Sequence, residues 1–559
     1  MSAQITPAAG LYDLNESAAP LGFLNADARE NTTANGKTSY TIAQAANQLT
    51  GGEPGWTPFG VPATITYGFR ATAPDTMPSD TTDFSRFNTA QITQAEQALT
   101  AWSDVANIRF SRVGFGSSGD AAYTDQATML FANYGSGESG SAAFAYFPGS
   151  YLATAKAGDV WTNVSKSYNA APTGSNYGGQ VLVHEIGHTL GLGHPSDYDS
   201  TSGSDFTYAA NASYYEDSRQ YTVMSYFDED ETGGYFGPNY GATPMLDDIA
   251  AAQLLYGTNM TTRTGDTVYG FNSNAGRTWF DANVGRMVTA VWDAGGNDTF
   301  DFSGYTNNQT IDLRQGNFSS VGGLVGNVAV AKGADIENAI GGTGADTLWG
   351  NGLNNVLRGG GGADSVSGGA GADTLVETSG SNVLRGDEGD DQISGGSDFD
   401  DINGNMGNDT AHGNAGDDWV VGGKNEDLLY GDAGSDIVYG NLGNDTVYGG
   451  DGNDVVRGGQ GDDSVVGDTG DDLLWGDRGN DTIAGGAGAD RFSFFSGAGN
   501  DRITDFSYAQ GDRVVIEGGA TYSITQQGAD VVVTLTSGDT LVVASVTAAS
   551  LPAGWILAG

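Results

Sequence analysis

Apolar residues recur along this chain with two different periods, and the change of period falls near residue 259. Before it, stretches with helical spacing alternate with short strand-like runs. The residues from Asn88 onward predict a helix, because Ile92, Leu99 and Trp102 form an apolar stripe at helical spacing. Gln91 can complete a capping box with Asn88 at the start of this helix.

The same reasoning predicts the other elements of the first part. Helices are expected near 42–49, from about 177 to 190, and around 245–255, where Gly257 ends the last of them. Strands are expected at 63–69, at 127–134 and, as an edge strand, at 141–147. Residues 1–36 are polar without a clear period, so we expect a flexible leader, with a propeptide as one interpretation.

Beyond residue 259, strand-like runs alternate with clusters of Gly, Asn and Asp, and from 341 to 493 the chain consists of 17 consecutive nine-residue units. The first position is Gly in every unit except the one that starts at Glu377. The sixth is Asp in 15 units and Asn at Asn355 and Asn382, and the eighth is always apolar. A fixed period of this length is typical of a solenoid.

The repeat also indicates its chemistry. The eighth position would point from a short strand into a shared core, while the glycines allow tight turns that expose carbonyl oxygens. Carbonyl oxygens with the sixth-position carboxylate are hard ligands suited to calcium. Two units would make one coil of a right-handed parallel roll that folds when calcium binds. The alternative is an acidic disordered linker, which the strict eighth position disfavours.

Composition narrows the classes of partner. The 559 residues suffice for several domains, and the net charge of −47 argues against nucleic acid and anionic membranes. No apolar run could span a bilayer, and the N-terminus lacks the pattern of a Sec signal peptide. The chain has no cysteine, which excludes thiol catalysis and disulfides. A protein that crosses a channel unfolded and folds in extracellular calcium would explain these features together.

Three of the four histidines lie within HEIGHTLGLGH. His184 and His188 are four residues apart, so on a helix they share one face and can bind one metal ion. Gly191 lets the chain leave the helix, and His194 returns as a third ligand. Three protein ligands with an open position are typical of catalytic zinc, with Glu185 beside the metal as a general base. The extended HExxHxxGxxH spacing is far more specific than HExxH alone.

A second motif follows 30 residues later, where TVMSY contains Met224 and Tyr226. A lone Met is usually core filler, and a lone Tyr is usually a half-buried aromatic residue. After HExxHxxGxxH, Met224 instead indicates a turn beneath the zinc-binding histidines.

Together, HEIGHTLGLGHP, VMSY and the nonapeptides resemble the serralysin family of metzincin zinc endopeptidases. The likeness runs from about residue 37 to the end, and Pro195 matches it. It implies an α+β metzincin protease domain followed by an all-β parallel roll. It also implies that Tyr226 is a further zinc ligand that moves away when substrate binds and then assists catalysis. The run of repeats is longer than the family usually carries.

The resemblance implies calcium ligands just before the repeats, and the repeat pattern implies more within them. Those before the repeats map to Arg263, Gly265, Thr267, Asp293, Gly295, Gly296, Asp298, Asp335 and Glu337. Those in the repeats are Gly342, Gly344, Asp346, Asp364, Asp373, Asp391, Asp400, Asp409, Asp418, Asp427, Asp436, Asp445, Asp454, Asp463, Asp472, Asp481 and Asp490. The expected cofactors are therefore one zinc ion and several calcium ions.

These observations predict five segments. They are a leader (1–36), a zinc protease domain (37–258), the first strands leading into the roll (259–340), the calcium-binding repeats (341–493) and a C-terminal β cap with a type I secretion signal (494–559). The expected protein is a secreted monomer that cleaves extended polypeptides, exported by type I secretion machinery. A proteinaceous inhibitor is a further expected partner.

Two other functions stay open at this point. The long repeat run also fits a cell-surface or matrix protein, in which the protease domain only processes adhesins or surface-layer proteins. A zinc hydrolase acting on a non-peptide substrate is the other alternative, which the metzincin pattern disfavours.

Overall fold

The computed structural model describes residues 22–30, 32–78, 81–137, 141–149, 157–198, 207–241 and 243–559. These form two compact units. The first contains the residues up to Asn259 with Val288–Ala290 and Leu324–Asn327, and the second contains Met260–Met287, Val291–Gly323 and Val328–Gly559. The unit boundary near residue 259 lies where the sequence pattern changes, while the division into five segments stays a prediction. Among the described helices, none has the length and apolar character that a bilayer span requires.

The sheet of the first unit has five strands, and the first four in spatial order run parallel. The last strand, β6, pairs antiparallel with β7 and lies at the edge, as the sequence predicted. In spatial order the strands are β4 (Ile108–Arg112), β3 (Ala63–Phe69), β5 (Met129–Tyr134), β7 (Val160–Asn163) and β6 (Ala143–Ala145). A two-stranded ribbon, β1 (Thr33–Ala34) with β2 (Lys37–Thr38), precedes them.

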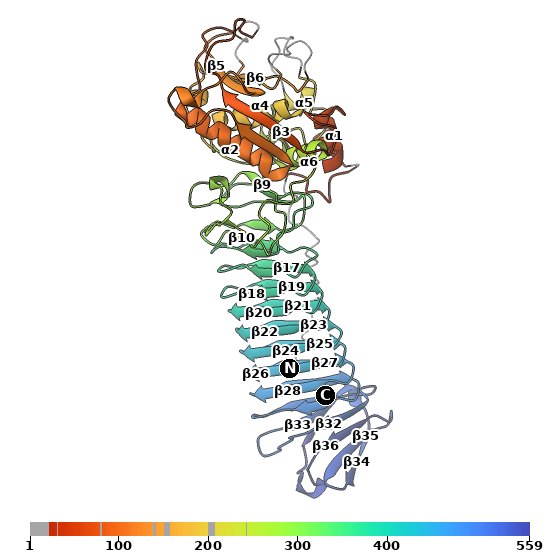
Figure 1. The fold of residues 1–559 in the computed structure, drawn as a ribbon. Coiled ribbons are helices and arrows are strands. Elements are labelled where there is room, and N and C mark those ends of the chain that lie inside the picture. The colour runs from red at the N-terminus through yellow and green to blue at the C-terminus, as the bar shows by residue number, and fades with distance from the viewer. Residues whose placement is uncertain are drawn as a thin grey trace. The chain divides into compact units, whose positions relative to one another are not determined.

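The four long helices of this unit occur where the sequence predicted them, while the two short helices were not predicted (Figure 1). The long ones are α1 (Ile42–Thr50), α2 (Thr89–Val105), α4 (Tyr177–Leu190) and α6 (Leu246–Tyr256), and the short ones are α3 (Ser167–Ala170) and α5 (Tyr208–Asn211). The capping box of Asn88 and Gln91 is present at the start of α2. The indole of Trp102 in α2 is fully buried and donates a hydrogen bond to the Val183 carbonyl of α4, 3.1 Å away. Helix α2 therefore supports the helix that carries the histidines.

Part of the predicted leader is packed into the first unit. The Arg29 guanidinium is buried, lies 2.9 Å from an Asp247 carboxylate oxygen and 3.5 Å from Glu216, and donates to the Tyr40 carbonyl at 2.8 Å. The expectation of a flexible segment is therefore wrong around Arg29. Residues 1–21 lie outside the described residues, and the propeptide interpretation stays a prediction.

The second unit is dominated by two large sheets, whose strands alternate along the chain. In spatial order the larger consists of β34 (Tyr522–Gln527), β35 (Asp530–Leu535), β36 (Thr540–Val543), β32 (Asn500–Ile503), β30 (Thr482–Ala484), β28 (Ser464–Thr469), β26 (Thr446–Asp451), β24 (Leu428–Ala433), β22 (Thr410–Ala415), β20 (Gln392–Ser397), β18 (Thr374–Val376), β16 (Val356–Arg358), β14 (Asn338–Ile340), β10 (Thr299–Asp301) and β8 (Val268–Gly270).

The other large sheet contains most of the odd-numbered strands. It consists of β11 (Thr310–Asp312), β15 (Thr347–Trp349), β17 (Ser365–Ala370), β19 (Val383–Glu388), β21 (Asp401–Met406), β23 (Trp419–Lys424), β25 (Ile437–Leu442), β27 (Val455–Gln460), β29 (Leu473–Arg478), β31 (Arg491–Phe494), β33 (Arg513–Ile516) and β37 (Ile556–Ala558). A separate antiparallel pair is formed by β12 (Phe318–Ser319) and β13 (Val328–Val330), and β9 spans Thr289–Val291.

The register confirms that two units make one coil. Within the repeats, neighbouring strands in each sheet are parallel and offset by two nine-residue units, so Val420 lies beside Val438 and Leu429 beside Val447. Figure 1 shows these strands stacked one after another. Every eighth-position side chain is buried, including the smallest, Ala411. The roll core is thus one narrow row of apolar side chains per sheet.

Glycine is required where successive coils approach closely. Gly434 has φ +154°, and a methyl group placed on it would lie 1.4 Å from the Gly416 carbonyl oxygen of the previous coil. No other side chain fits at that position without moving the backbone. Gly352 is also in the repeats, but a methyl group placed on it would meet no atom within 4 Å.

The C-terminal tail ends the parallel pattern. Strands β34, β35 and β36 form an antiparallel meander, and β37 near the last residue pairs parallel with β33. This arrangement fits the cap that a solenoid needs. The secretion signal in the same residues stays a prediction.

We expect Gly434→Ala to destabilise the calcium-loaded roll by about 1–3 kcal/mol, because the added methyl group must displace the neighbouring coil. Gly352→Ala is the matched control and should leave stability within about 0.5 kcal/mol of the parent chain. Denaturant unfolding followed by circular dichroism measures both. Equal stability of the two variants would show that the coils can separate at Gly434 without cost.

Candidate metal centre

Helix α4 positions two of the three histidines. Its Asn176 cap accepts a hydrogen bond from the Gly179 amide, and the helix ends at Gly191, whose φ of +104° is left-handed. His184 and His188 lie one turn apart within it. Gly191 then turns the chain so that His194 comes back to the same point.

The imidazoles form a set suited to one metal ion. One ring nitrogen from each of His184, His188 and His194 lies within 4.8 Å of the others, the only such cluster of three among the described residues. The Nε2 atoms of His188 and His194 are 3.1 Å apart. Two imidazole nitrogens face each other at this distance only with a cation or a proton between them, so the geometry fits a bound ion.

Backbone carbonyls orient two of these rings. His184 Nδ1 lies 2.8 Å from the Val223 carbonyl oxygen, and His188 Nδ1 lies 2.7 Å from that of Leu192. Donation from Nδ1–H to these carbonyls leaves the Nε2 lone pairs for a metal. Burial lowers the pKa of His184 to about 4 and of His194 to about 3. The rings are therefore neutral at pH 7, as ligands must be.

Glu185 lies on the same helix and is almost completely buried. Its Oε2 atom has no hydrogen-bond partner among the described residues, and burial raises the pKa of its carboxyl to about 8 in the metal-free chain. A cation at the neighbouring imidazoles would favour the ionised form. A buried carboxyl group beside the histidines, with an oxygen left unpaired, is suited to exchange a proton with a bound molecule.

Met224 lies beneath the histidine helix. Its side chain is fully buried, and a methyl group placed on Gly187 would lie 2.6 Å from the Met224 sulfur. The thioether therefore packs directly against the helix backbone between Glu185 and His188. The role of Met224 as the turn that supports the zinc-binding histidines stays a prediction, and this contact is consistent with it.

Tyr226 lies over the imidazoles. Its ring centroid is 4.6 Å from that of His194 and 5.9 Å from that of His184, while half of the side chain (52%) is exposed. Burial of the rest and the nearby Glu185 raise the pKa of the Tyr226 phenol to about 12. The ring thus contacts the histidines, while the role of Tyr226 as a further zinc ligand stays a prediction.

Sequence reasoning missed the residues that fix this arrangement. Asp217 is fully buried and accepts hydrogen bonds from Ser196 Oγ at 2.6 Å, from Ser225 Oγ at 2.7 Å and from the Tyr198 hydroxyl. Asp248 accepts from the Val223 amide at 2.8 Å. No short motif contains these residues, and only an alignment of relatives could have indicated them.

The predicted edge strand β6 lies near the site, although residues 138–140 and 150–156 beside it are outside the described residues. The backbone of β6 makes antiparallel pairs with β7 on one side only. Phe147, just beyond the strand, places its ring 5.3 Å from that of His188. An extended chain paired to β6 would therefore pass close to the histidines.

Most of the predicted calcium ligands before the repeats are brought together. Asp298 accepts from the Thr267 amide at 2.7 Å, while its own amide donates to Glu337 at 2.6 Å. Its Oδ2 atom has no hydrogen-bond partner among the described residues. Burial, with Asp293 and Glu337 nearby, raises the pKa of Asp298 to about 7. This unpaired oxygen among carboxylates fits a bound cation.

The remaining predicted ligands differ in how close they lie to the cluster around Asp298. Gly265 and Gly296 approach it, because a methyl group on Gly296 would lie 2.7 Å from the Gly265 carbonyl oxygen and 2.8 Å from Asp298 Oδ1. The Gly295 amide donates to Asp293 at 2.9 Å. The Arg263 side chain donates to the Tyr269 hydroxyl and lies 3.9 Å from an Asp293 carboxylate oxygen. Asp335 accepts from Gln315 at 2.7 Å.

The sixth-position carboxylates repeat one arrangement along the roll. One oxygen of each accepts an amide hydrogen bond from the sixth position of the preceding coil; Asp436 thus accepts from the Asp418 amide at 2.8 Å. The other oxygen is buried without a hydrogen-bond partner among the described residues in every sixth-position Asp from Asp364 to Asp490. Asp346 differs, because its second oxygen accepts from the Gly342 amide at 2.6 Å. The Gly344 carbonyl faces Gly362 of the next coil.

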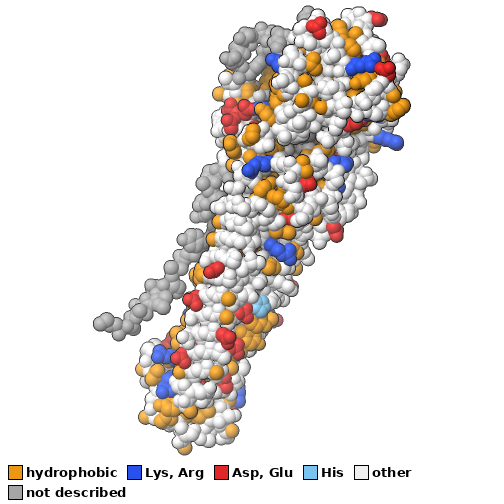
Figure 2. Space-filling model, turned by 90° about the vertical axis from the view of Figure 1, so that its left-hand side faces the viewer, with side chains coloured by type: hydrophobic (Ala, Val, Ile, Leu, Met, Phe, Trp, Pro, Cys, Tyr) orange, Lys and Arg blue, Asp and Glu red, His pale blue; other side chains and the backbone are white. Residues whose placement is uncertain are grey.

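These carboxylates are electrostatically unfavourable without a counter-ion. Burial, followed by neighbouring carboxylates, raises the pKa of Asp427 to about 8 and of Asp391 to about 7. Figure 2 shows other acidic side chains on the visible face of the roll, but the sixth-position carboxylates are buried. Their charge lies inside the coils, where it fits calcium ions coordinated by oxygen atoms.

The two Asn units depart from this pattern. Asn382 Nδ2 donates to the Gly380 carbonyl at 2.8 Å and to Asp400 at 2.9 Å. Asn355 Nδ2 donates to the Glu337 carbonyl at 2.8 Å. In these two units the Asn amide nitrogen thus donates to neighbouring oxygens, which a carboxylate at the same position could not do. Glu377, which sequence reasoning did not count as a ligand, accepts from the Gly359 amide at 2.7 Å.

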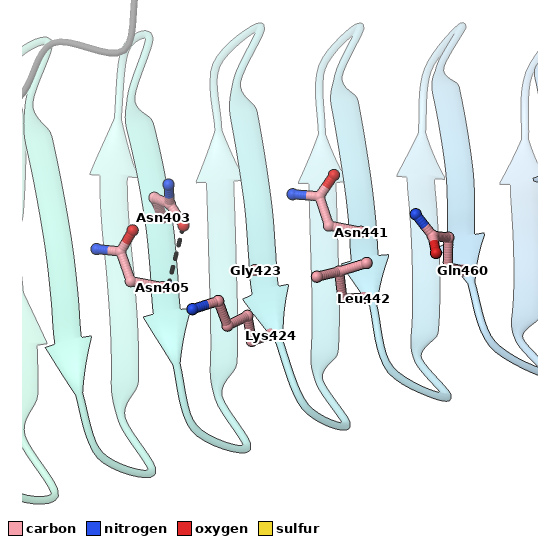
Figure 3. Close-up of a pocket in the computed structure, with 7 residues that line it drawn as sticks. All are labelled: Asn403, Asn405, Gly423, Lys424, Asn441, Leu442 and Gln460. Carbon is pink, nitrogen blue, oxygen red and sulfur yellow. Dashed lines mark hydrogen bonds between the residues drawn. The ribbon is translucent and has the colours of Figure 1, made fainter.

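A shallow groove of about 350 Å³ crosses the outer face of strands β21 to β27 (Figure 3). It is lined by Asn403, Asn405, Gly423, Lys424, Asn441, Leu442 and Gln460. Asn405 and Asn441 have φ values of +73° and +79°, a left-handed backbone that Asn tolerates. The coil geometry accounts for these amides, so we assign the groove no role.

Comparisons with known proteins agree with this geometry. The family model described as Matrixin matches residues 62–217, and that described as Peptidase M10 serralysin C terminal matches residues 258–542. The chain is 52% identical over 327 residues to Serralysin C of Dickeya chrysanthemi, which covers 58% of this chain and 66% of that protein. It is 44% identical over 341 residues to Metalloprotease AprA of Pseudomonas entomophila, covering 59% and 68%.

The chain therefore spans slightly less than two thirds of Serralysin C. One solved structure, the AlgE6R3 subunit of the Azotobacter vinelandii mannuronan C5-epimerase, is 29% identical and covers 22% of this chain and 80% of that one, but its TM-score of 0.18 supports no argument. The fold and the three histidines define a matrixin-type metalloprotease domain joined to a parallel β-roll. The chain belongs to the serralysin family, which confirms the resemblance seen in its motifs.

We expect His194→Ala to weaken zinc binding by more than about 100-fold, because loss of a ligand should exceed the 10- to 100-fold effect of an outer-shell partner. His412→Ala, which changes the only histidine outside the motif, is the matched control and should keep one zinc per chain. Metal analysis after dialysis against a weak chelator measures both. Equal zinc content in the two variants would exclude His194 as a ligand.

Proposed function

We propose that this protein is a secreted zinc endopeptidase that hydrolyses extracellular proteins and is stabilised by calcium bound along its roll. The observation that carries the proposal is the cluster of His184, His188 and His194 with the buried Glu185 beside it. Family membership supports it, because the relatives are named Serralysin and Metalloprotease AprA.

The three imidazoles would hold the zinc through Nε2. A bound zinc ion lowers the pKa of its water to about 7 and polarises a substrate carbonyl. Glu185 would take the proton of the attacking water and deliver it to the leaving amine. Its burial supports this role, because a carboxyl group with a raised pKa holds the proton well enough to transfer it.

Tyr226 would act as a further ligand in the resting site and as a hydrogen-bond donor during hydrolysis. Its contact with the His194 ring supports the first role, and its half-exposed ring supports movement between the two. The raised pKa of the phenol favours the protonated form, which can donate.

The unpaired side of β6 is the expected binding edge for the substrate. Main-chain hydrogen bonds to an extended peptide do not depend on its side chains, so the specificity would be broad. Type I secretion machinery, a proteinaceous inhibitor and a monomeric state remain part of the proposal, supported by family membership alone.

Calcium is proposed along the roll and at the cluster around Asp298. The buried, unpaired Asp oxygens support this, since each adds a carboxylate to a turn whose carbonyls are already exposed. Binding free energy would then be folding free energy. The protein would fold in extracellular calcium after export.

A second candidate function is a cell-surface or matrix protein, in which the roll is the main functional part and proteolysis only processes adhesins or surface-layer proteins. The length of the repeat run favours it. Clearing of casein by the zinc-loaded protein would favour the first candidate.

We expect Glu185→Gln to reduce caseinolysis by about 10²- to 10⁴-fold while zinc content is unchanged, because the substitution removes the general base and leaves the imidazoles in place. Glu53→Gln, an exposed carboxyl in the same unit, is the control. Casein zymography with metal analysis provides the measurement. Retained caseinolysis in metal-replete Glu185→Gln would refute the mechanism.

Without calcium, the roll should be more stable at about pH 5.5 than at pH 8. The sixth-position Asp residues from Asp364 to Asp490 have folded-state pKa values of about 6 to 8, as in Asp364 and Asp427, above the unfolded value near 3.9. The folded roll therefore binds more protons, so stability is gained as the pH falls through these values and lost as it rises again.

Circular dichroism and denaturant unfolding in a chelator at the two pH values measure this effect. Saturating calcium is the control, because protons then compete with the ion and acidification should weaken calcium binding. A β signal in chelator that is weaker at about pH 5.5 than at pH 8 would contradict the assignment of these carboxylates.

A further inference from the structure

The Tyr226 ring rests against a second tyrosine. The Tyr198 ring lies nearly parallel to it, with centroids 4.7 Å apart and planes inclined by 21°. Tyr198 also lies 5.2 Å from the His194 ring and meets Phe227 edge-on at 5.4 Å. The Tyr226, Tyr198 and His194 rings therefore contact one another as a group of three, while Tyr226 stays half exposed.

Tyr198 is held in turn by a buried carboxylate. Its hydroxyl donates to Asp217, which also accepts from Ser196 and Ser225. Ser196 lies two residues after His194, and Ser225 directly precedes Tyr226. The fully buried Asp217 side chain thus links the segment after His194 to the turn that carries Tyr226.

We propose that Tyr198, fixed by Asp217, is a positioning residue that holds the Tyr226 phenol at the metal and so sets how easily Tyr226 is displaced. This inference rests on the proposed function, because it takes Tyr226 as a ligand of the zinc. It concerns an interaction within the chain, and no part of it depends on how Glu185 acts.

The stacking of Tyr198 on Tyr226 should contribute a measurable free energy. An offset aromatic pair contributes ~0.5–1.5 kcal/mol, so loss of the Tyr198 ring should shift the ratio of resting to displaced Tyr226 by about 2- to 12-fold. Tyr226 is half exposed, and the ring contacts found for it are with Tyr198, His184 and His194. Of these three neighbouring rings, only that of Tyr198 does not belong to a proposed metal ligand.

The test uses the full calcium-loaded chain with Cu²⁺ in place of zinc. A phenolate bound to Cu²⁺ gives a charge-transfer band in the visible spectrum, so the parent chain should show the band and Tyr226→Phe should lack it. Acetohydroxamate is then added as a competing ligand, and the concentration that halves the band reports how firmly Tyr226 is held. A purely structural role for Tyr198 would not move this midpoint.

We expect the midpoint to fall by about 2- to 12-fold in Tyr198→Leu, which removes the ring. A smaller fall is expected in Tyr198→Phe, which keeps the ring and loses only its bond to Asp217. Tyr208→Phe is the matched control, because Tyr208 packs 5.6 Å from the same Phe227 and donates to the Tyr215 carbonyl, and its midpoint should equal that of the parent.

An unchanged midpoint in Tyr198→Leu, in a variant with parental circular dichroism and copper content, overturns the proposal. A parent spectrum without the band also overturns it, because Tyr226 would then not rest on the metal. Neither result affects the Glu185 test, so failure of this inference and failure of the proposed protease activity are separately visible.

Discussion

The structure depends on a set of buried metal-ligand groups that have no compensating partner among the described residues. In the first unit three neutral imidazoles converge with one nitrogen of each within 4.8 Å of the others, and in the second a column of Asp residues each turns into the coil one oxygen that has no partner among the described residues. Uncompensated buried charge is among the most destabilising features a fold can contain. The narrow row of apolar side chains in each sheet gives the roll little to offset it. Bound ions convert the same groups into the strongest interactions available.

Much of the fold follows from local sequence. Helix α4 begins at Tyr177 and ends at Leu190 because Asn176 caps it and Gly191 can take a left-handed backbone. The roll follows from its period, since an apolar eighth position in every unit leaves one consistent register, and that register is observed. Local signals of this kind act within one turn or one repeat, which is why a single sequence reveals them.

The rest depends on contacts between distant positions. Arg29 pairs with Asp247 across 218 residues, and nothing near Arg29 distinguishes it from a residue of a polar leader. Asp217 follows Glu216 in an unremarkable acidic stretch, yet the first joins Ser196 to Ser225 while the second accepts from the Tyr40 amide. Only the fold decides which buried partner a carboxylate meets, so spacing rules could locate the zinc ligands and not the residues that orient them.

These distant contacts determine how the site can act. The imidazoles alone form a rigid set, because carbonyls of Val223 and Leu192 fix two of the rings and the Met224 sulfur supports their helix. Rigidity of this kind holds a metal but leaves no part free to respond to a substrate. Among the described residues of the site, Tyr226 is half exposed and held mainly by stacking, so our proposal assigns to it the restraint that breaks and reforms. The site must therefore be both preorganised and accessible. The hydrogen-bonded histidines meet the first requirement, and the stacked Tyr226 phenol meets the second.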